Sequence, residues 1–186
     1  MSSNDLFNIH KFESVFTSAA VVDCVNDNSD YLLLVIPEIK NMIGFEHKHP
    51  HHHLDVWQHT LETMRNLHTT DLELNLAGLF HDIGKPFCYQ EGIVRHFHGH
   101  PETSAKIAEQ ILTRLGYDKL FINRIMYLVT THDTLINTSS LDNTPEMIKK
   151  RLQLQYADAK SHHPDKVSPR LRKLDAIAYK LNIQIE

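Results

Sequence analysis

Residues 71–86 read DLELNLAGLFHDIGKP, a strongly apolar run that ends in an ionisable pair, His81-Asp82. The apolar positions predict a helix from Asp71 to Asp82 that is buried on more than one side, and Gly84 predicts its end. Burying an ionisable pair is costly unless its members are hydrogen-bonded or bind a metal. Adjacent helical residues point about 100° apart, so both can contact one ion only where the helix is ending. The stretch therefore predicts, at the end of a buried helix, either a hydrogen-bonded polar pair or a metal site.

Helical periodicity also dominates the rest of the chain. Apolar residues recur three and four positions apart over residues 54–68, which predicts an amphipathic helix with His59 to the side of its apolar stripe, Leu54, Trp57, Leu61, Met64 and Leu67. Start and stop signals predict further helices over residues 9–25, 30–42 with an interruption at Pro37, 101–115, 118–131, 144–160 and 168–181. Residues 85–99 predict a loop over the site, with a small hairpin as a possible part of it. The expected architecture is an all-α helical bundle.

Size and composition are those of an ordinary globular protein. The 186 residues fit one domain, 1–186, and the formal charge of -4 excludes a general attraction for polyphosphate backbones, so any nucleic-acid contact must be local. Cys24 and Cys88 are too few for a disulfide framework or a thiolate metal site, and we interpret both as unpaired thiols of a reducing compartment. No apolar run approaches the length of a membrane span, and the N-terminal stretch has no basic start followed by an apolar segment. We expect a cytoplasmic protein without membrane contact.

Histidine is the unusual feature of the composition, with 15 residues spread along the chain. A terminal tag does not explain this number, because the triplet at 51–53 is internal. We interpret the alternating run His47, His49, His51 and His53 as solvated or as an adventitious metal-binding run. The basic residues near the start of the last helix, Arg170, Arg172 and Lys173, are likewise interpreted as a solvated face.

A lone carboxylate, Asp158, lies in an apolar helical context, where it is a natural counter-charge for a divalent cation. The ordered set His59, His81-Asp82 and Asp158 resembles the H…HD…D pattern of the HD superfamily of metal-dependent phosphohydrolases. More narrowly, roughly residues 35–160 are similar to the HD domain of bacterial tRNA nucleotidyltransferases and poly(A) polymerases. The motifs that carry this similarity are PEIK (37–40), GF (44–45), His52, DVWQHTL (55–61), LFHDIGKP (79–86) and HGHPETSA (98–105). The nucleotidyltransferase head of those enzymes has no counterpart in these residues, so CCA addition is not expected.

The resemblance implies a ligand set. It places one divalent ion between His59, His81, Asp82 and Asp158, with Asp82 able to bridge to a second ion. His100 and His132 match two further histidines of binuclear relatives. His98 competes with His100, which is preferred because it immediately precedes the helix that begins with Pro101. One ion or two, and Mn, Ni, Co, Fe, Mg or Zn, are open alternatives.

The resemblance also implies hydrolysis of a phosphoester. A bound cation lowers the pKa of coordinated water toward about 7, which makes water a nucleophile at neutral pH. The catalytic group is expected to contain Asp82, Lys85, as a point charge for a phosphate oxygen, and His52, which would contact phosphate or protonate the leaving group. Arg95 and His96 are weaker candidates on the loop.

Two functions of different classes follow. The first is a phosphohydrolase that acts on phosphomonoesters or phosphodiesters of nucleotides or RNA ends. The second is a non-catalytic, metal-stabilised module that binds RNA or a protein, which is disfavoured because a binder need not retain every carboxylate and imidazole. The sequence does not indicate the oligomeric state.

Overall fold

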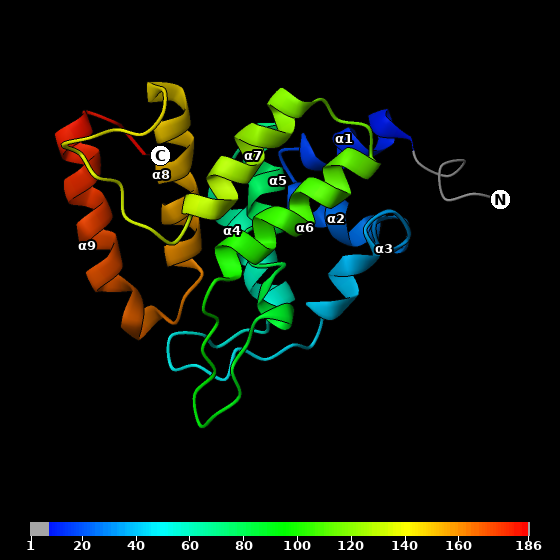
Figure 1. The fold of residues 1–186 in the computed structure, drawn as a ribbon, viewed down its shortest axis with the longest axis horizontal. Coiled ribbons are helices and arrows are strands. Elements are labelled where there is room, and N and C mark those ends of the chain that lie inside the picture. The colour runs from blue at the N-terminus through cyan, green and yellow to red at the C-terminus, as the bar shows by residue number, and fades with distance from the viewer. Residues whose placement is uncertain (1–7, 186) are drawn as a thin grey trace.

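The computed structural model describes residues 8–185, and this part of the chain consists of helices joined by loops, of which the longest connect Asn41 to Val56, Phe87 to His100 and Thr131 to Pro145 (Figure 1). The helices are α1 (Ile9–Phe16), α2 (Val21–Asp27), α3 (Ser29–Val35), α4 (Val56–Leu67), α5 (Leu72–Phe80), α6 (His100–Arg114), α7 (Lys119–Thr131), α8 (Pro145–Lys160) and α9 (Pro164–Leu181), with short 3₁₀ turns at Pro37–Asn41 and Lys85–Phe87. Extended pairing within the described residues is limited to two isolated bridges, Glu46 with Asp55 and Gln90 with His96. The all-α prediction is confirmed, and the second bridge is a minimal hairpin in the loop before α6.

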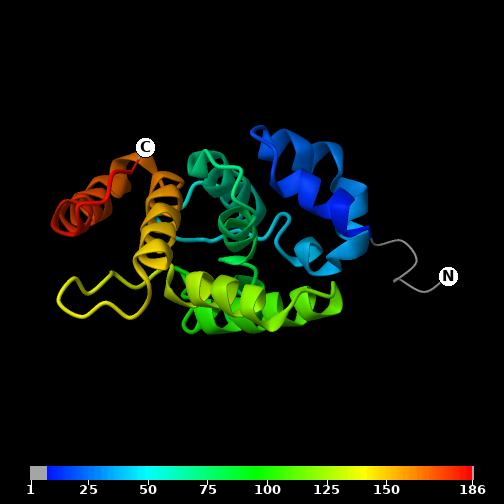
Figure 2. The same ribbon diagram turned by 90° about the horizontal axis from the view of Figure 1, so that it is seen from above.

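The helices surround a central pair, α4 and α5 (Figures 1 and 2). Helices α1, α2 and α3 lie at one end, α6 and α7 pack side by side along one face, and α8 and α9 form the other end. The main hydrophobic core holds fully buried side chains such as Phe12, Phe80 and Ile83. A smaller apolar cluster joins α8 to α9 around Leu152 and Leu174. None of these helices is both long and apolar enough to cross a bilayer.

Capping side chains fix where the site-bearing helices begin. The carboxylates of Asp55, Asp71 and Asp118 accept hydrogen bonds from backbone N–H groups in the first turns of α4, α5 and α7, and the Thr144 hydroxyl does the same for α8. Each cap satisfies a donor that the helix itself cannot pair. Helix α6 begins instead after Gly99, whose φ of 75° lies in the left-handed region that glycine tolerates. These starts place histidines in the first turns of α4 and α6.

Two predicted helix boundaries are wrong. The helix expected over residues 9–25 is divided, because the Thr17 hydroxyl donates to the carbonyl of Glu13 and the Ser18 hydroxyl accepts from the N–H of Ala20. Such local hydrogen bonds compete with helix continuation. The last helix begins at Pro164 rather than at residue 168, because proline suits the first helical position and the His163 ring caps it. Pro169 then lies inside α9, on an exposed face.

Candidate metal centre and active site

The predicted ligand residues come from five helices and meet at one point. His59 lies in the first turn of α4, His81-Asp82 directly follows α5, His100 starts α6, His132 directly follows α7, and Asp158 lies near the end of α8. All six side chains are buried, with between 0 and 7% of each residue exposed. Residues about a hundred positions apart in the sequence therefore share one small volume. The structure thus brings together every residue of the predicted ligand set.

Asp82 lies at the centre and divides the group into two halves. Its Oδ2 atom lies 3.6 Å from His59 Nε2 and 3.3 Å from His81 Nε2. His59 Nε2 also lies 3.0 Å from Asp158 Oδ1, which is 3.9 Å from His81 Nε2. These distances bring two imidazoles and two carboxylates to the same point. This half is suited to hold one ion.

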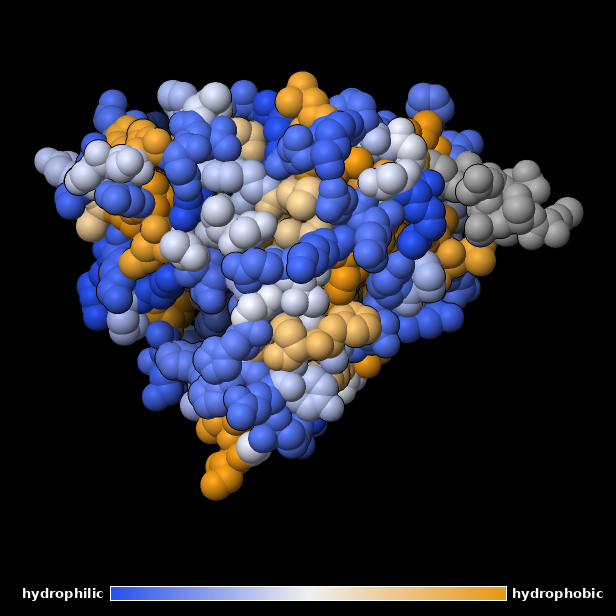
Figure 3. Space-filling model, viewed as in Figure 1, coloured by the Kyte–Doolittle hydropathy of each residue, from blue (hydrophilic) through white to orange (hydrophobic). Residues whose placement is uncertain are grey.

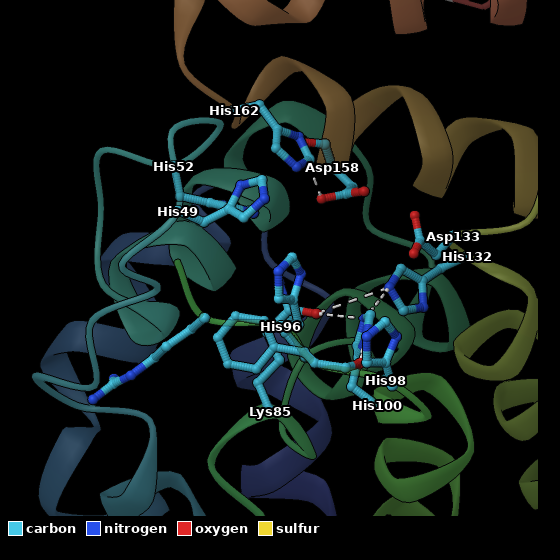
Figure 4. Close-up of a pocket in the computed structure, with 13 residues that line it drawn as sticks. His49, His52, Lys85, His96, His98, His100, His132, Asp133, Asp158 and His162 are labelled. Carbon is cyan, nitrogen blue, oxygen red and sulfur yellow. Dashed lines mark hydrogen bonds and ion pairs between the residues drawn. The ribbon is translucent and has the colours of Figure 1, made fainter. Parts of the chain in front are cut away.

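The other half of the group uses Oδ1 of the same carboxylate, on the side of the pocket where His100 and His132 lie (Figure 4). Asp82 Oδ1 lies 3.3 Å from His100 Nε2 and 3.8 Å from His132 Nε2. The two imidazole Nε2 atoms lie 3.2 Å from each other. Two groups of potential ligands, each with two histidines, thus share Asp82. His98 is exposed and stacks on His96 at the pocket mouth, so the structure favours His100 over His98 as the inward-facing histidine.

Backbone carbonyls orient the histidine rings. Nδ1 of His81 lies 2.7 Å from Gly78 O, Nδ1 of His100 lies 2.9 Å from Phe97 O, and Nδ1 of His132 lies 2.6 Å from Val129 O. His81 and His132 occupy equivalent places at the ends of α5 and α7, where the helices have carbonyls to satisfy. A carbonyl oxygen only accepts, so each Nδ1 carries the ring hydrogen and each Nε2 is left with a lone pair for a metal.

The nitrogen and oxygen atoms of the centre that lack a hydrogen-bond partner show whether a cation fits here. The facing Nε2 atoms of His100 and His132 repel each other unless a proton or a metal ion lies between them. His81 Nε2 and Asp82 Oδ1 are buried and have no hydrogen-bond partner among the described residues, whereas Asp82 Oδ2 is paired with Lys85. Buried polar atoms normally have partners. The residues present therefore fit a bound divalent ion in each half of the centre.

Electrostatics keeps the carboxylates ionised. Burial opposes the charge of Asp82, but Lys85 and His81 beside it hold the pKa of this carboxyl well below its ordinary value. Burial likewise opposes the charge of Asp158, and His162 and His59 hold its pKa low. Burial also opposes a charge on His81, yet the Asp82 carboxylate raises the pKa of this ring.

Lys85 and His47 complete the surroundings of Asp82. The Lys85 ammonium is buried and lies 2.7 Å from Asp82 Oδ2 and 3.2 Å from His47 Nε2. His47 was expected to be solvated with its neighbours, and this expectation is wrong, because only 2% of the residue is exposed. Its Nδ1 lies 3.0 Å from the carbonyl of Leu54, which fixes the ring inside the loop. The bridge between Glu46 and Asp55 folds this loop back over the site.

His52 lies across the pocket from the His100 side of the centre (Figure 4). Its ring stacks on that of His47 at a centroid distance of 3.7 Å. Burial and the charge of Lys85 lower the pKa of His52 far below its ordinary value. His162, which the sequence analysis did not single out, lies beside it at 4.5 Å between ring centroids. His162 Nδ1 lies 3.8 Å from Asp158 Oδ1, one helical turn away. This i, i+4 spacing from Asp158 is the sequence signal that could have identified His162.

An open pocket of about 250 Å³ leads from the surface to these residues. Asp82, Lys85, His100, His132 and Asp158 line its base, and Arg95, His96 and His98 come from the loop before α6. The surface is visibly hollowed between α9 and the loops below it (Figure 3). A small phosphoester can therefore reach the predicted ligands from solvent.

Comparisons with known proteins agree with this geometry. The chain is 37% identical over 106 residues to the A-adding tRNA nucleotidyltransferase of Deinococcus radiodurans and 38% identical over 105 residues to the CC-adding tRNA nucleotidyltransferase of Thermus thermophilus. These matches cover 53% and 52% of this chain but only 24% of each relative. The multifunctional CCA protein of Shewanella denitrificans is 28% identical over 115 residues, which are 59% of this chain and 27% of that protein.

The matched chain thus spans about a quarter of the length of these relatives. The family model of the HD domain matches residues 52–175. That range begins just before α4 and contains all six of the converging residues. Because the match extends over more than half of the chain, the chain belongs to the HD domain family.

Proposed function

We propose that this protein is a metal-dependent phosphohydrolase that cleaves phosphomonoesters or phosphodiesters of nucleotides or RNA ends. The observation that carries the proposal is the pair of His–His–Asp groups that share Asp82 at the base of an open pocket. The HD domain family is one of metal-dependent phosphohydrolases, and the buried cluster supplies the donors that such chemistry needs. The names of the relatives describe action on tRNA, which supports RNA ends as substrates by analogy.

The metal centre in this proposal is binuclear. His59, His81, Asp82 and Asp158 would hold one ion, and Asp82, His100 and His132 would hold the other. Bound divalent ions would supply positive charge for phosphate oxygens and would lower the pKa of water toward neutrality. The nitrogen and oxygen donors suit Mn, Ni, Co, Fe, Mg and Zn, and elemental analysis of the purified protein distinguishes them.

Lys85 and His52 have roles of their own in the proposal. Lys85 lines the pocket and carries a buried positive charge, so it would neutralise a non-bridging phosphate oxygen. His52 has two candidate roles, contact with phosphate and protonation of the leaving group. The lowered pKa of His52 keeps its ring neutral at pH 7, so we favour contact with phosphate through a ring N–H. Asp82 would organise both ions and is the group whose loss should be most damaging.

The two unpaired thiols support a location in the cytoplasm. Cys24 and Cys88 are both partly buried and neither forms a disulfide. We therefore place the proposed reaction in a reducing compartment.

The test is hydrolysis of p-nitrophenyl phosphate, bis-p-nitrophenyl phosphate and a panel of nucleotides and 2′,3′-cyclic nucleotides by protein loaded with each metal in turn. Asp82→Asn should abolish turnover, because both halves of the centre depend on this carboxylate. Asp23→Asn is the matched control, since Asp23 is exposed on α2 and remote from the pocket. Absence of turnover with every metal, or undiminished turnover in Asp82→Asn, would refute the proposed hydrolase activity. Tight RNA binding that survives chelation, without hydrolysis, would instead favour the binding module.

A further inference from the structure

A second pocket, of about 300 Å³, adjoins the candidate metal centre between the end of α8 and the first turns of α9. It shares Asp133, Asp158 and His162 with the first pocket, so the two are continuous at the proposed reaction site. His51 contributes to its wall, and the carbonyl of His51 accepts a hydrogen bond of 2.8 Å from the N–H of His163. The loop over the metal centre is thereby joined to the start of α9.

The α9 side of this second pocket is basic. Lys166, Arg170 and Lys173 line it, at spacings of four and three residues that place them on one face of the helix. We call these three residues the α9 basic row. At a helical rise of about 1.5 Å per residue, the row extends for roughly 10 Å. This length exceeds what one phosphate group needs.

The charges of the α9 basic row are largely available to a ligand. Within residues 8–185, no carboxylate oxygen lies within 4.0 Å of the ammonium of Lys166 or Lys173. Arg170 donates to the carbonyl of Asp133 at 3.1 Å, and its nearest carboxylate oxygen, on Asp133, lies 4.0 Å away. Arg170 is thus held beside the residue that follows His132, at the junction of the two pockets.

This local charge contrasts with the rest of the protein. The chain has a formal charge of -4, yet residues 160–173 carry Lys160, Lys166, Arg170, Arg172 and Lys173 against one acidic residue, Asp165. A cluster of cations in an acidic protein provides a local attraction for anions that the whole surface does not. The apolar part of the wall consists of Ala159, Val167 and Pro169, and its rings are the imidazoles of His51 and His162, without Phe, Tyr or Trp. The three cations of the α9 basic row therefore make the wall better suited to phosphates than to bases.

We propose that the α9 basic row binds the phosphodiester backbone of a single-stranded oligonucleotide whose reacting phosphate lies at the metal centre. The inference rests on the proposed function, because the continuity of the two pockets gives it meaning only if a phosphoester binds at Asp82. With these contacts, a strand that carries several phosphates is a better substrate than a mononucleotide. Its contacts are independent of base identity.

The test measures binding apart from catalysis. A fluorescent single-stranded pentanucleotide with a 3′-phosphate is titrated, over a range of salt concentrations, into protein that carries Asp82→Asn. Adding Lys166→Gln, Arg170→Gln and Lys173→Gln should weaken binding at least about tenfold near 0.1 M salt and reduce the salt slope by about 2, since single strands lose about 0.7 per contact. The matched control is Lys160→Gln, Arg172→Gln and Lys180→Gln, an equal charge change at exposed positions outside the pocket, which should leave binding nearly unchanged.

Three results would overturn the inference. The first is equal binding of the oligonucleotide by the row variant and the control variant. The second is a loss of binding to a polyglutamate peptide of the same charge that equals the loss of binding to the oligonucleotide. The third is an unchanged KM for the oligonucleotide when the three row substitutions are made in protein with intact Asp82. The row variant should leave hydrolysis of bis-p-nitrophenyl phosphate unaltered. If small phosphoesters are hydrolysed but the row variant binds the oligonucleotide normally, the proposed role of the α9 basic row is refuted and the proposed hydrolase activity is retained. If no substrate is hydrolysed but the row variant loses binding of the oligonucleotide, the proposed hydrolase activity is refuted and the α9 basic row is retained as a nucleic-acid binding site.

Discussion

His100 Nε2 and His132 Nε2 lie 3.2 Å apart, and the Nδ1 atom of each ring contacts a backbone carbonyl. With both hydrogens on Nδ1, the two Nε2 lone pairs point at each other beside Asp82 Oδ1. This arrangement is stable only with a positive charge between the rings. It supports the proposal that the His100 and His132 half of the centre holds an ion of its own.

Replacing His132 should therefore remove one ion and leave the other. We expect His132→Gln to reduce the metal content from two ions to one per chain, because His59, His81, Asp82 and Asp158 are untouched. Mass spectrometry of metals after dialysis against dilute metal measures this content. His10→Gln, at an exposed position on α1, should retain both ions. An unchanged metal content in His132→Gln would mean that this half holds no ion.

Gly84 sets the distance between the His81-Asp82 turn and the start of α6. A Cβ atom at this position would lie 2.6 Å from Ser104 N, 2.8 Å from Ser104 Oγ and 2.9 Å from His100 O. Gly84→Ala must push α6 away, so we expect a loss of about 2 kcal/mol in the free energy of unfolding, typical of overpacking. His100 moves with α6, so the affinity for the second ion should fall as well. Urea unfolding and metal titration measure the two effects.

The control for this substitution is Gly92→Ala. Gly92 lies in the exposed loop before α6, where the nearest atom to an added Cβ is Val94 O at 3.1 Å. That loop can adjust, so stability and metal affinity should change little. Equal effects of the two substitutions would show that the contact between Gly84 and α6 is not the cause.

Much of the centre could be predicted from the sequence, in part because some of its residues occupy positions that local rules identify. His59, His100 and His132 follow from the resemblance to the HD superfamily, whereas local rules identify His81-Asp82, which ends an apolar helix, and Asp158, which lies in an apolar helical context. Each of these is an ionisable group in a place where burial requires a partner. The helix assignments follow from caps and periodicity, which are also local.

The rest depends on chain paths that local rules do not describe. His47 lies in a run whose alternation indicated solvent, and it is buried only because the Glu46 and Asp55 bridge folds its loop inward. Arg170 and Lys173 of the α9 basic row were predicted to lie on a solvated face, and their position beside the candidate metal centre follows from the packing of α9 on α8. Pro169 indicated a helix start, because nothing local distinguishes it from Pro164.

Lys85 offers a test of charge near the reacting phosphate. We expect Lys85→Met to lower kcat for bis-p-nitrophenyl phosphate by about 100-fold or more, as for other groups that stabilise developing charge. Metal content should not fall, because the substitution removes a cation that pairs with Asp82 Oδ2 rather than a ligand. Steady-state kinetics and metal analysis separate these effects. Lys48→Met, at a largely exposed ion pair with Glu91, is the control and should retain wild-type kcat. A loss of metal in Lys85→Met would show that Lys85 is needed for metal binding rather than for the charge of the reacting phosphate.

The pH dependence of stability provides a test that needs no substrate. Burial and the charge of Lys85 lower the pKa of His47 from 6.5 to about 4 in the folded protein, whereas the unfolded chain keeps the ordinary value. Between these values the unfolded state binds more protons, so the free energy of unfolding is greatest above pH 6.5 and falls as the pH drops toward 4. For His47 alone the loss from pH 7 to pH 5 should be about 2 kcal/mol.

His47→Gln should remove this contribution. Urea unfolding in the presence of a chelator, at pH 7 and pH 5, should show a difference between the two pH values that is smaller by about 2 kcal/mol than in the wild type. His132, whose pKa burial and His81 lower to about 4, remains in the variant and preserves part of the dependence. His10→Gln should follow the wild-type curve, because this histidine is exposed on α1. If the curves of His47→Gln and the wild type were parallel, the burial of His47 would not be coupled to folding, and the inward path of its loop would be wrong.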